Sequence, residues 1–396
     1  MDNNNIFASR VMGLQASAIR EIFKLTGAKD IISLAGGNPA VESFPNKEFA
    51  AIAQEMLETN PVGTLQYGTT EGYGPLRVMV SDKMRKAGNL KDWDECIITT
   101  GGQQAIDLAL KVLIEDGDGV IVEEPSFIGT LNSARSFNGQ LHGVPVLDDG
   151  MDLDAAEEIL KTKSIKMIYT IPTFQNPSGI TMSLEKRKRL IELAEKYNVF
   201  ILEDNPYGEL RFEGEEIPTI KSMDTQGRVL YVGSFSKTLS SGLRVGYICA
   251  RADIVEKIVV VKQVNDVHTP CLNQILVAEY MKRYNMDEHV EKIRQLYKKR
   301  CGVMLSAMDS EFPDYCKYTR PQGGLFILCT LPDGIDTKKM LPVAVENKVA
   351  FVPGYAFMVD IEKPRSIFRL NYSGAEGDML AEGVSRLAKV IKDYVG

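Results

Sequence analysis

Short apolar runs alternate with longer amphipathic segments between residues 95 and 255, and this alternation constrains the fold more than any other feature of the chain. The runs interpreted as strands are C-I-I-T-T, G-V-I-V-E-E, K-M-I-Y-T-I, V-F-I-L-E-D, V-L-Y-V-G-S and V-G-Y-I-C-A. One amphipathic segment, residues 183–198, follows a potential N-cap at Ser183 and carries Leu190 and Leu193 on one face. Continuously apolar strands are typical of a parallel sheet that helices bury on both faces. We therefore predict an α/β fold with a mostly parallel sheet, which would bind ligands beyond the carboxyl ends of its strands.

A different pattern follows residue 255. Helical periodicity continues to about residue 310, and three strand-like runs and a terminal helical segment come after it. The strand-like runs are F-I-L-C-T-L, V-A-F-V-P-G and F-R-L-N-Y-S, and they predict a smaller α+β layer. Because 396 residues are many for a single core, we expect two domains of unequal size.

Composition argues against several classes of function. The net charge is −7, from 46 basic and 53 acidic residues, and no basic run is present, so nucleic-acid binding is not expected. No apolar run reaches the roughly 18 residues that cross a bilayer, and no signal-peptide pattern is present, so we expect a cytoplasmic protein without membrane association. The three histidines are far apart in sequence, which disfavours a metal site. The six cysteines lack C-x-x-C spacing and are interpreted as reduced core residues.

Polar residues gather at four places where predicted strands end. The first is T-T-G-G-Q-Q-A-I-D-L-A-L, residues 99–110, in which Gly101 and Gly102 precede a helix that begins near Gln103. Glycines let the backbone approach a ligand closely, and the N-terminus of a helix attracts phosphate. An ordinary tight turn between a strand and a helix is the alternative interpretation.

The second and third places contain an amide and a carboxylate. Asn176, in P-T-F-Q-N-P-S-G, stands in a turn and could contact a ligand oxygen, or could simply form the turn. Asp204 ends the apolar run F-I-L-E-D, and Tyr207 follows three residues later. A carboxylate at a buried strand end is costly unless a positive group meets it. Asp204 therefore either faces a cationic ligand or serves in a cap or salt bridge.

The fourth place is Y-V-G-S-F-S-K-T-L-S-S-G-L-R-V-G-Y, in which Lys237 lies near Ser234, Ser236 and Arg244. The hydroxyls and the two cations could surround a phosphate. Desolvation and neighbouring cations would lower the pKa of Lys237 and make its amine a nucleophile. A solvated surface lysine is the weaker interpretation, because apolar sequence lies on both sides. The S-x-x-K pattern of serine acyl enzymes is disfavoured because no K-T-G occurs.

The four clusters together match what pyridoxal 5′-phosphate requires, namely a lysine for a Schiff base, an acid at the pyridine nitrogen and a phosphate cradle. S-F-S-K-T-L-S-S-G-L-R-V-G-Y also resembles the cofactor-lysine segment of class I/II (fold type I) aminotransferases, and the resemblance extends over nearly the whole chain. It is most similar to the 2-aminoadipate and kynurenine aminotransferase subgroup. The segments that carry this likeness are I-R-E-I-F-K-L-T, I-S-L-A-G-G-N-P-A, L-Q-Y-G-T-T-E-G-Y-G-P-L-R, H-T-P-C-L-N-Q and R-P-Q-G-G-L-F.

The resemblance implies a particular domain organisation. A large domain, residues 45–290, would contain a seven-stranded-type, mostly parallel sheet between layers of helices. Residues 1–44 and 291–396 would form a smaller α+β domain from the two ends of the chain. The resemblance also implies a homodimer with shared active sites, in which Tyr67 reaches the cofactor phosphate of the partner subunit.

The resemblance further implies a role for each site residue. Lys237 would form the Schiff base and move a proton between the substrate Cα and the cofactor C4′, while Asp204 would pair with the pyridine nitrogen. Arg369 would bind the substrate α-carboxylate bidentately, beside Gly37 and Asn176. The other cofactor contacts would come from Asn176 and Tyr207 at the ring O3′, and from Gly102, Gln103, Ser234, Ser236 and Arg244 at the phosphate.

Two positions depart from the family's usual residues, and a third bears on the choice of substrate. Phe127, in E-E-P-S-F, stands where the family usually has tyrosine, so stacking on the cofactor ring is retained but a hydroxyl partner is lost. Gly102 stands where relatives often have serine and leaves only its backbone N–H. Arg20 matches a position that meets a distal substrate carboxylate in the aminoadipate subgroup, and a solvated helix arginine is the alternative.

The implied activity is transfer of an amino group from an L-amino acid to a 2-oxo acid such as 2-oxoglutarate. The expected donors are 2-aminoadipate, glutamate and aromatic or branched-chain amino acids. Because the core residues do not fix which Cα bond breaks, a cysteine-conjugate β-lyase or a decarboxylase remains an alternative. A cofactor-sensing transcriptional regulator is a more distant alternative, because the family-like segments begin by residue 19 and we expect no preceding winged helix-turn-helix.

Overall fold

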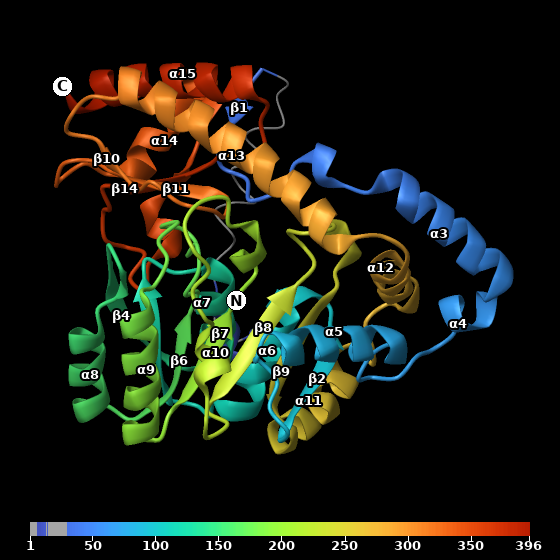
Figure 1. The fold of residues 1–396 in the computed structure, drawn as a ribbon. Helices are drawn as coiled ribbons and strands as arrows, with labels where there is room; N and C mark the ends of the chain where they lie inside the picture. The colour runs from blue at the N-terminus through green and yellow to red at the C-terminus, as the bar shows by residue number, and fades with distance from the viewer. Residues whose placement is uncertain (1–5, 13, 15–29) are drawn as a thin grey trace.

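The computed structural model describes residues 6–12, 14 and 30–396. In this part of the chain, a central sheet has eight strands (Figure 1). β3, β4, β6, β7 and β8 pair in parallel, whereas β9 is antiparallel to both of its neighbours and β5 is antiparallel to β4. The prediction of an α/β fold with a mostly parallel sheet is therefore confirmed. In spatial order the strands are β2 (Asp94–Thr99), β9 (Gly246–Arg251), β8 (Val229–Ser234), β7 (Phe200–Asp204), β6 (Ile165–Thr170), β3 (Gly119–Glu124), β4 (Gln140–Leu147) and β5 (Gly150–Met151).

Helices cover both faces of this sheet, as continuously apolar strands require. Successive strand residues point to opposite faces, so Tyr169 packs in one hydrophobic cluster and Ile168 in another. The first face is covered by α6 (Gly101–Leu113), α7 (Ile128–Ser136) and α11 (Ala252–Asn265). The second face is covered by α5 (Gly74–Lys86), α8 (Leu153–Thr162), α9 (Leu184–Tyr197), α10 (Ile220–Met223) and α12 (Cys271–Arg283).

The helix predicted within residues 183–198 is α9. The Ser183 hydroxyl accepts a hydrogen bond from the Lys186 backbone N–H at 3.3 Å, so the predicted N-cap is present. The helix ends at Asn198, whose φ of +55° lies in the left-handed region that asparagine tolerates. Both ends of this helix are therefore set by local sequence.

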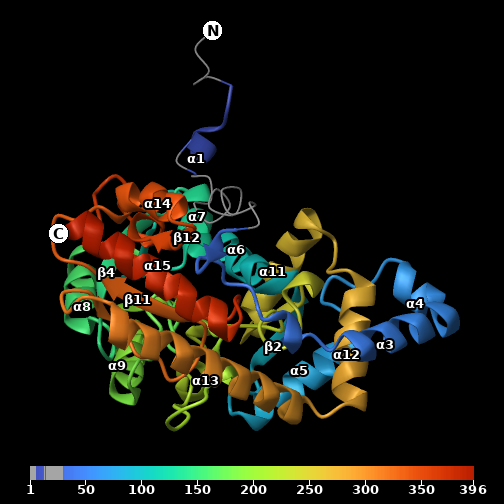
Figure 2. The same cartoon turned by 90° about the horizontal axis from the view of Figure 1, so that it is seen from above.

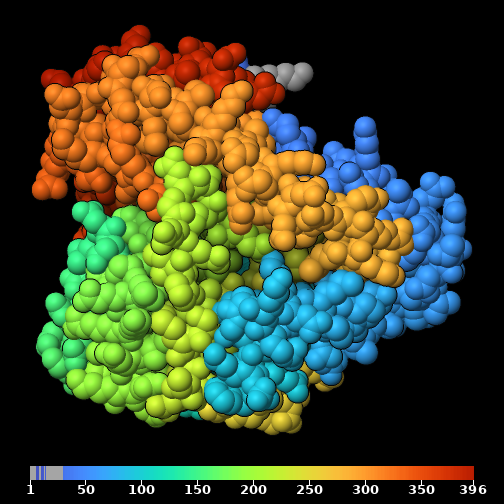
Figure 3. All heavy atoms as spheres, in the orientation of Figure 1, coloured from blue at the N-terminus to red at the C-terminus, as the bar shows by residue number. Residues whose placement is uncertain are grey.

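The C-terminal residues form a second, smaller sheet that lies above the large sheet in Figure 1. It is antiparallel, with the order β10 (Lys317–Tyr318), β11 (Phe326–Thr330), β14 (Ile367–Asn371) and β13 (Val352–Pro353). Near it, the N-terminal strand β1 (Ile32–Ser33) pairs in parallel with β12 (Val349–Ala350). The helices of this part are α13 (Met286–Glu311), α14 (Thr337–Glu346) and α15 (Gly377–Val395). In the space-filling view these orange and red residues lie directly on the green residues of the large-sheet part (Figure 3).

The pairing of β1 with β12 brings segments near the two ends of the chain together. The boundaries at residues 44/45 and 290/291 stay a prediction. α13 runs without interruption through residue 290. The remaining elements are α1 (Ser9–Met12), α3 (Asn46–Thr59) and α4 (Pro61–Leu65), and the 3₁₀ turns Val41–Ser43, Gly208–Leu210, Ser241–Leu243 and Gly354–Phe357. None of the helices in the described part of the chain has the length and apolar character needed to cross a bilayer.

Two strands of the large sheet were not predicted from the sequence. β4 is only half-buried and includes Pro145, so it does not form a continuous apolar run. β5 has only two residues and pairs antiparallel with β4 after a turn at Asp148 and Asp149. Gly150 permits this turn because its φ is +110°, a conformation that favours glycine. β5 raises the number of strands to eight among the described residues, one more than the seven-stranded type that was expected.

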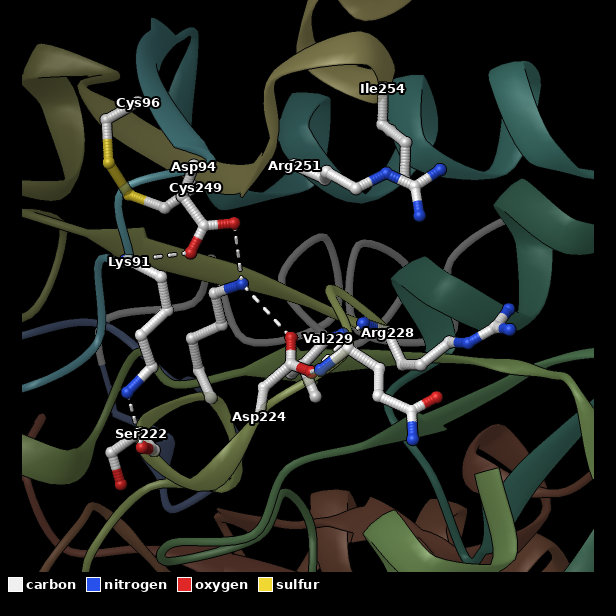
Figure 4. A network of polar contacts seen from close by, with 12 residues as sticks. Lys91, Asp94, Cys96, Ser222, Asp224, Arg228, Val229, Cys249, Arg251 and Ile254 are labelled. Carbon is white, nitrogen blue, oxygen red and sulfur yellow. Dashed lines mark hydrogen bonds and ion pairs between the residues drawn. A yellow bond between two sulfur atoms is a disulfide. The ribbon is translucent and has the colours of Figure 1, made fainter. Parts of the chain in front are cut away.

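The prediction that all six cysteines are reduced is wrong for two of them. Cys96 in β2 and Cys249 in β9 lie directly opposite each other, with their Cα atoms 4.3 Å apart, and form a disulfide (Figure 4). They are 153 residues apart in the sequence, so only the pairing of β2 with β9 reveals the bond. Because the bond closes a very long loop, it restricts the unfolded chain strongly and should stabilise the fold.

We therefore expect denatured, unreduced protein to present four thiols, those of Cys271, Cys301, Cys316 and Cys329, and six after reduction. Thiol titration measures both numbers. Replacing Cys96 and Cys249 together by serine should lower the free energy of unfolding by about 2–4 kcal/mol in urea denaturation. Cys271→Ser, at a partly exposed free thiol, is the control and should have little effect. Six thiols without reduction would contradict the disulfide.

Candidate active site

The carboxyl ends of the parallel strands meet at one edge of the large sheet, and the predicted site residues follow these ends. Asn176 lies after β6, Asp204 is the last residue of β7, and Lys237 lies just after β8. β9 runs in the opposite direction, so Arg244, which precedes its first residue Gly246, returns to the same edge. Sheet topology thus brings together groups that are far apart in the sequence.

These residues line a cavity of about 220 Å³. Twelve residues named from the sequence lie around it: Gly37, Gly102, Gln103, Phe127, Asn176, Asp204, Tyr207, Ser234, Ser236, Lys237, Arg244 and Arg369. The cavity therefore has cationic groups, a carboxylate, hydroxyls and an aromatic ring in one enclosure.

One end of the cavity is suited to phosphate. Arg244 has a φ of +53°, and its guanidinium donates hydrogen bonds to the carbonyls of Ser241 at 3.2 Å and Thr100 at 3.4 Å. Only glycine fits at two positions beside this arginine. A Cβ on Gly101 would lie 2.3 Å from Arg244 Nη2, and a Cβ on Gly246 would lie 2.7 Å from the Gly101 carbonyl carbon. The N-terminus of α6 opens at the same place and favours an anion.

Two seryl hydroxyls and the backbone N–H of Gln103 are the other groups at this end. Ser234 Oγ donates to Ser236 Oγ at 2.9 Å and accepts from the Ser236 backbone N–H at 3.1 Å. The side-chain amide of Gln103 donates to Gly129 O at 3.2 Å and to Ser133 Oγ at 3.1 Å. Gln103 could therefore offer a phosphate only its backbone N–H, as Gly102 would.

The amine of Lys237 projects into the cavity and donates one hydrogen bond, to the Gly37 carbonyl at 2.8 Å. Burial, followed by the charges of Arg369 and Arg244, lowers the pKa of Lys237 to about 8. A lysine with this pKa has a useful neutral fraction near neutral pH, as a nucleophilic amine requires.

The carboxylate of Asp204 is nearly fully buried, and burial raises its pKa to about 7. Its carboxylate accepts a hydrogen bond from the Tyr169 hydroxyl at 2.8 Å, and it forms no ion pair with any described residue. Tyr207 packs edge-on against Phe326, with 5.7 Å between the ring centroids. An unpaired buried carboxylate at a cavity wall is the arrangement expected when a cationic ligand group meets it.

Arg369 is fully buried and has fewer partners than its donors allow. Its Nη1 donates to Asn176 Oδ1 at 2.8 Å and its Nη2 donates to Ala35 O at 2.7 Å, while its Nε has no partner within the described structure. The guanidinium carbon lies 4.1 Å above the ring centroid of Phe326. It forms no ion pair with any described carboxylate.

Two other buried cations show the contrast. Arg187 donates five hydrogen bonds, to Met182 O, Ile217 O, Pro218 O, Pro172 O and Thr173 Oγ1. Lys221 lies 3.0 Å from the carboxylate of Asp94 and 3.3 Å from that of Asp224. Figure 4 labels these two carboxylates. These cations are satisfied within the fold, whereas Arg369 retains donors for a ligand.

The residues of the cavity fit pyridoxal phosphate. Arg244 and the seryl hydroxyls would hold the phosphate, Asp204 would face the pyridine nitrogen and Phe127 would stack on the ring. Lys237 would reach the aldehyde. When bound, this cofactor withdraws electrons from the substrate Cα through its ring.

One predicted site residue, Tyr67, is not among the residues that line this cavity. Tyr67 is 81% exposed and packs edge-on against His268, with 5.8 Å between the ring centroids. Arg20 lies outside the described residues. Sequence reasoning also missed five lining residues, namely Ile106, Ile171, Pro206, Ser241 and Phe326. Phe326 ends the motif R-P-Q-G-G-L-F, so its position in that motif was a usable signal.

Comparison with known proteins identifies the family. The family model of aminotransferase class I and II matches residues 29–387. Aromatic-amino-acid aminotransferase 1 of Thermococcus litoralis is 42% identical over 399 residues, which cover 99% of this chain and 95% of the relative.

Two solved structures are closely similar. The kynurenine aminotransferase of Pyrococcus horikoshii, in complex with PMP, has a TM-score of 0.95 at 39% identity and covers 100% of this chain and 99% of its own. The alpha-aminoadipate aminotransferase of Thermus thermophilus, complexed with N-(5′-phosphopyridoxyl)-L-leucine, has a TM-score of 0.91 at 38% identity and covers 98% of both chains.

The fold and the cavity define a fold type I enzyme that uses pyridoxal 5′-phosphate. The chain belongs to the class I and II aminotransferases. The predicted family, enzyme class and cofactor are thereby confirmed.

The lowered pKa of Lys237 can be measured without cofactor. Because only the neutral amine reacts with acetic anhydride, labelling of Lys237 in the apoprotein should rise with pH and reach half its maximum near pH 8. Lys83 is the internal control. Burial lowers the pKa of Lys83, but the charges of Glu209 and of other groups raise it above the ordinary value, so Lys83 should react only at higher pH. Peptide mass spectrometry follows each lysine separately. A midpoint for Lys237 near the ordinary lysine value of about 10.4 would contradict the account.

Proposed function

We propose that this chain transfers the amino group of an L-amino acid to a 2-oxo acid such as 2-oxoglutarate, through a Schiff base at Lys237. The proposed donors are 2-aminoadipate, glutamate and aromatic or branched-chain amino acids. The observation that carries the proposal is the presence, in one cavity, of a lysine with a lowered pKa, an unpaired carboxylate and a buried arginine with free donors.

Arg369 is the proposed anchor for the substrate α-carboxylate. A buried guanidinium without a carboxylate partner is costly, and a bound substrate would supply that partner. Its planar donors suit bidentate binding of a carboxylate. Contacts with Asn176, Ala35 and Phe326 hold the guanidinium in place, so little conformational freedom would be lost on binding.

Lys237 is the proposed proton carrier between the substrate Cα and the cofactor C4′. Its amine donates to Gly37 O, and Gly37 lies beside Phe326, over whose ring the guanidinium of Arg369 is placed. With a pKa of about 8, roughly a tenth of this amine is neutral at pH 7 and able to accept a proton. Asp204, which lines the same cavity, would keep the pyridine nitrogen protonated.

The names of the relatives support a broad range of donors. The similar proteins described above are named for aromatic amino acids, kynurenine and alpha-aminoadipate. Arg20, the proposed partner of a distal carboxylate, lies outside the described residues. The proposed donors therefore include both acidic and aromatic amino acids. The proposed location is the cytoplasm.

A panel of amino donors tests the proposed reaction. Each candidate L-amino acid is incubated with the loaded enzyme and 2-oxoglutarate, and glutamate formation is measured over time. We expect steady glutamate formation with 2-aminoadipate and with at least one aromatic donor. Lys237→Ala should abolish it, whereas Lys257→Ala, at an exposed lysine on α11, should not.

Two outcomes would contradict this proposal. The absence of turnover with every pair of glutamate and a 2-oxo acid would exclude the transfer reaction. Release of pyruvate and ammonia from a cysteine conjugate, without amino transfer, would favour the β-lyase instead.

We further propose a homodimer in which Tyr67 completes the partner's site. α3 and α4 project from one side of the molecule (Figure 2), and the chain after α4 carries the exposed Tyr67. Val62 and Leu65 on α4 are also exposed, as is Val264 on α11. The exposed apolar side chains of α4 are the proposed contact surface for a second copy of this chain.

Hybrid dimers test whether sites are shared. A dimer of one Lys237→Ala chain and one Tyr67→Phe chain would contain one site with both native groups if Tyr67 acts on the partner subunit. Such hybrids, isolated with two different affinity tags, should then regain about half of the wild-type activity. If Tyr67 served its own chain, the hybrid would show no gain over the Tyr67→Phe homodimer.

A further inference from the structure

We propose that Tyr169 is a positioning residue for the reaction: its hydroxyl anchors one oxygen of Asp204 and so directs the other toward the pyridine nitrogen of the cofactor. The inference rests on the role of Asp204 given under the proposed function. Tyr169 lines no part of the cavity and would act only through Asp204.

The pairing of β6 with β7 places the two side chains together. Tyr169 is in register with Leu202, and Asp204 lies two residues further along β7 on the same face of the sheet. The Tyr169 hydroxyl donates to Asp204 Oδ2 at 2.8 Å, and both residues are buried. No other hydrogen bond to this carboxylate is found in the described part of the chain.

The direction of the hydrogen bond is fixed by chemistry. Burial, followed by the negative charge of Asp204, raises the pKa of Tyr169 well above its usual value, so the phenol stays protonated and acts as the donor. Burial also raises the pKa of Asp204, and the bond from Tyr169 opposes that increase. Without the hydroxyl, the buried carboxylate would lose this stabilisation of its charged form.

A second buried carboxylate nearby provides the comparison. Glu123 accepts hydrogen bonds from Thr170 Oγ1 at 2.7 Å, from the Ile171 backbone N–H at 3.1 Å and from Gln175 Nε2 at 3.3 Å. Glu123 is thus satisfied by the fold on several sides. Asp204 has one anchored oxygen and borders the cavity, which is the arrangement that suits a carboxylate reserved for a ligand.

The decisive variant is Tyr169→Phe, which removes the hydroxyl and keeps the ring. Bound pyridoxal phosphate labelled with ¹⁵N at the pyridine nitrogen reports the protonation of that nitrogen through its chemical shift. In wild-type protein we expect the shift of a protonated nitrogen, and in Tyr169→Phe a clear change toward the unprotonated value. Because a hydrogen bond to a charged group changes an equilibrium constant by about tenfold or more, cofactor affinity should fall by at least that factor.

A matched control separates this effect from a general loss of packing. Tyr372 is also fully buried, and its hydroxyl donates to the Gly323 carbonyl at 2.9 Å. Tyr372→Phe loses one buried hydrogen bond, to a neutral carbonyl, without touching Asp204. It should lower stability and leave the ¹⁵N shift unchanged.

The apoprotein gives an independent readout. With ¹³C at aspartate carboxyl carbons, and with Asp204→Asn to assign the resonance, the titration midpoint of Asp204 should rise in Tyr169→Phe. An unchanged ¹⁵N shift together with an unchanged Asp204 midpoint would overturn the inference. Failure of the wild-type protein to bind pyridoxal phosphate would instead refute the proposed function, and the apoprotein titration would still decide the role of Tyr169.

Discussion

Unbalanced charge in a buried cavity is the constraint on which the site depends. Asp204, Lys237 and Arg369 line the same cavity, and none forms an ion pair within the described part of the chain. Elsewhere the fold satisfies two buried cations itself, Lys221 with the carboxylate of Asp94 and Arg187 with carbonyl and hydroxyl oxygens. Leaving these three groups unpaired costs stability. A cofactor with a cationic ring for Asp204 and an aldehyde for Lys237, together with a substrate carboxylate for Arg369, would recover that cost. The geometry is therefore that of a site prepared for its ligands.

The large sheet makes this arrangement possible. Parallel strands end at one edge, so turns that are distant in the sequence bring the proposed phosphate-binding residues, a carboxylate and a lysine to a single place. The reversed direction of β9 returns Arg244 to that edge. The smaller sheet then contributes Arg369 from β14, whose guanidinium also contacts Ala35 of the N-terminal segment. Both ends of the chain thus shape the part of the cavity where Arg369 lies.

Much of this could be predicted from the sequence, because the relevant signals are local. Six strands of the large sheet were predicted from apolar runs, and most of the residues that line the cavity were predicted from their positions after these runs. Features that depend on strand order could not be predicted. The Cys96–Cys249 disulfide and the contact between Tyr169 and Asp204 each join residues on neighbouring strands. Nothing in the spacing of those residues indicates that they meet, and β4 lacks the apolar continuity that identified the other strands.

The central claim is that Lys237 carries the cofactor covalently. The most direct measurement is peptide mass spectrometry of the loaded protein after borohydride reduction, which converts a Schiff base into a stable secondary amine. The account predicts one phosphopyridoxyl group per chain, on the peptide that contains Lys237. Attachment at a different lysine, or a reduced protein without any such group, would contradict it.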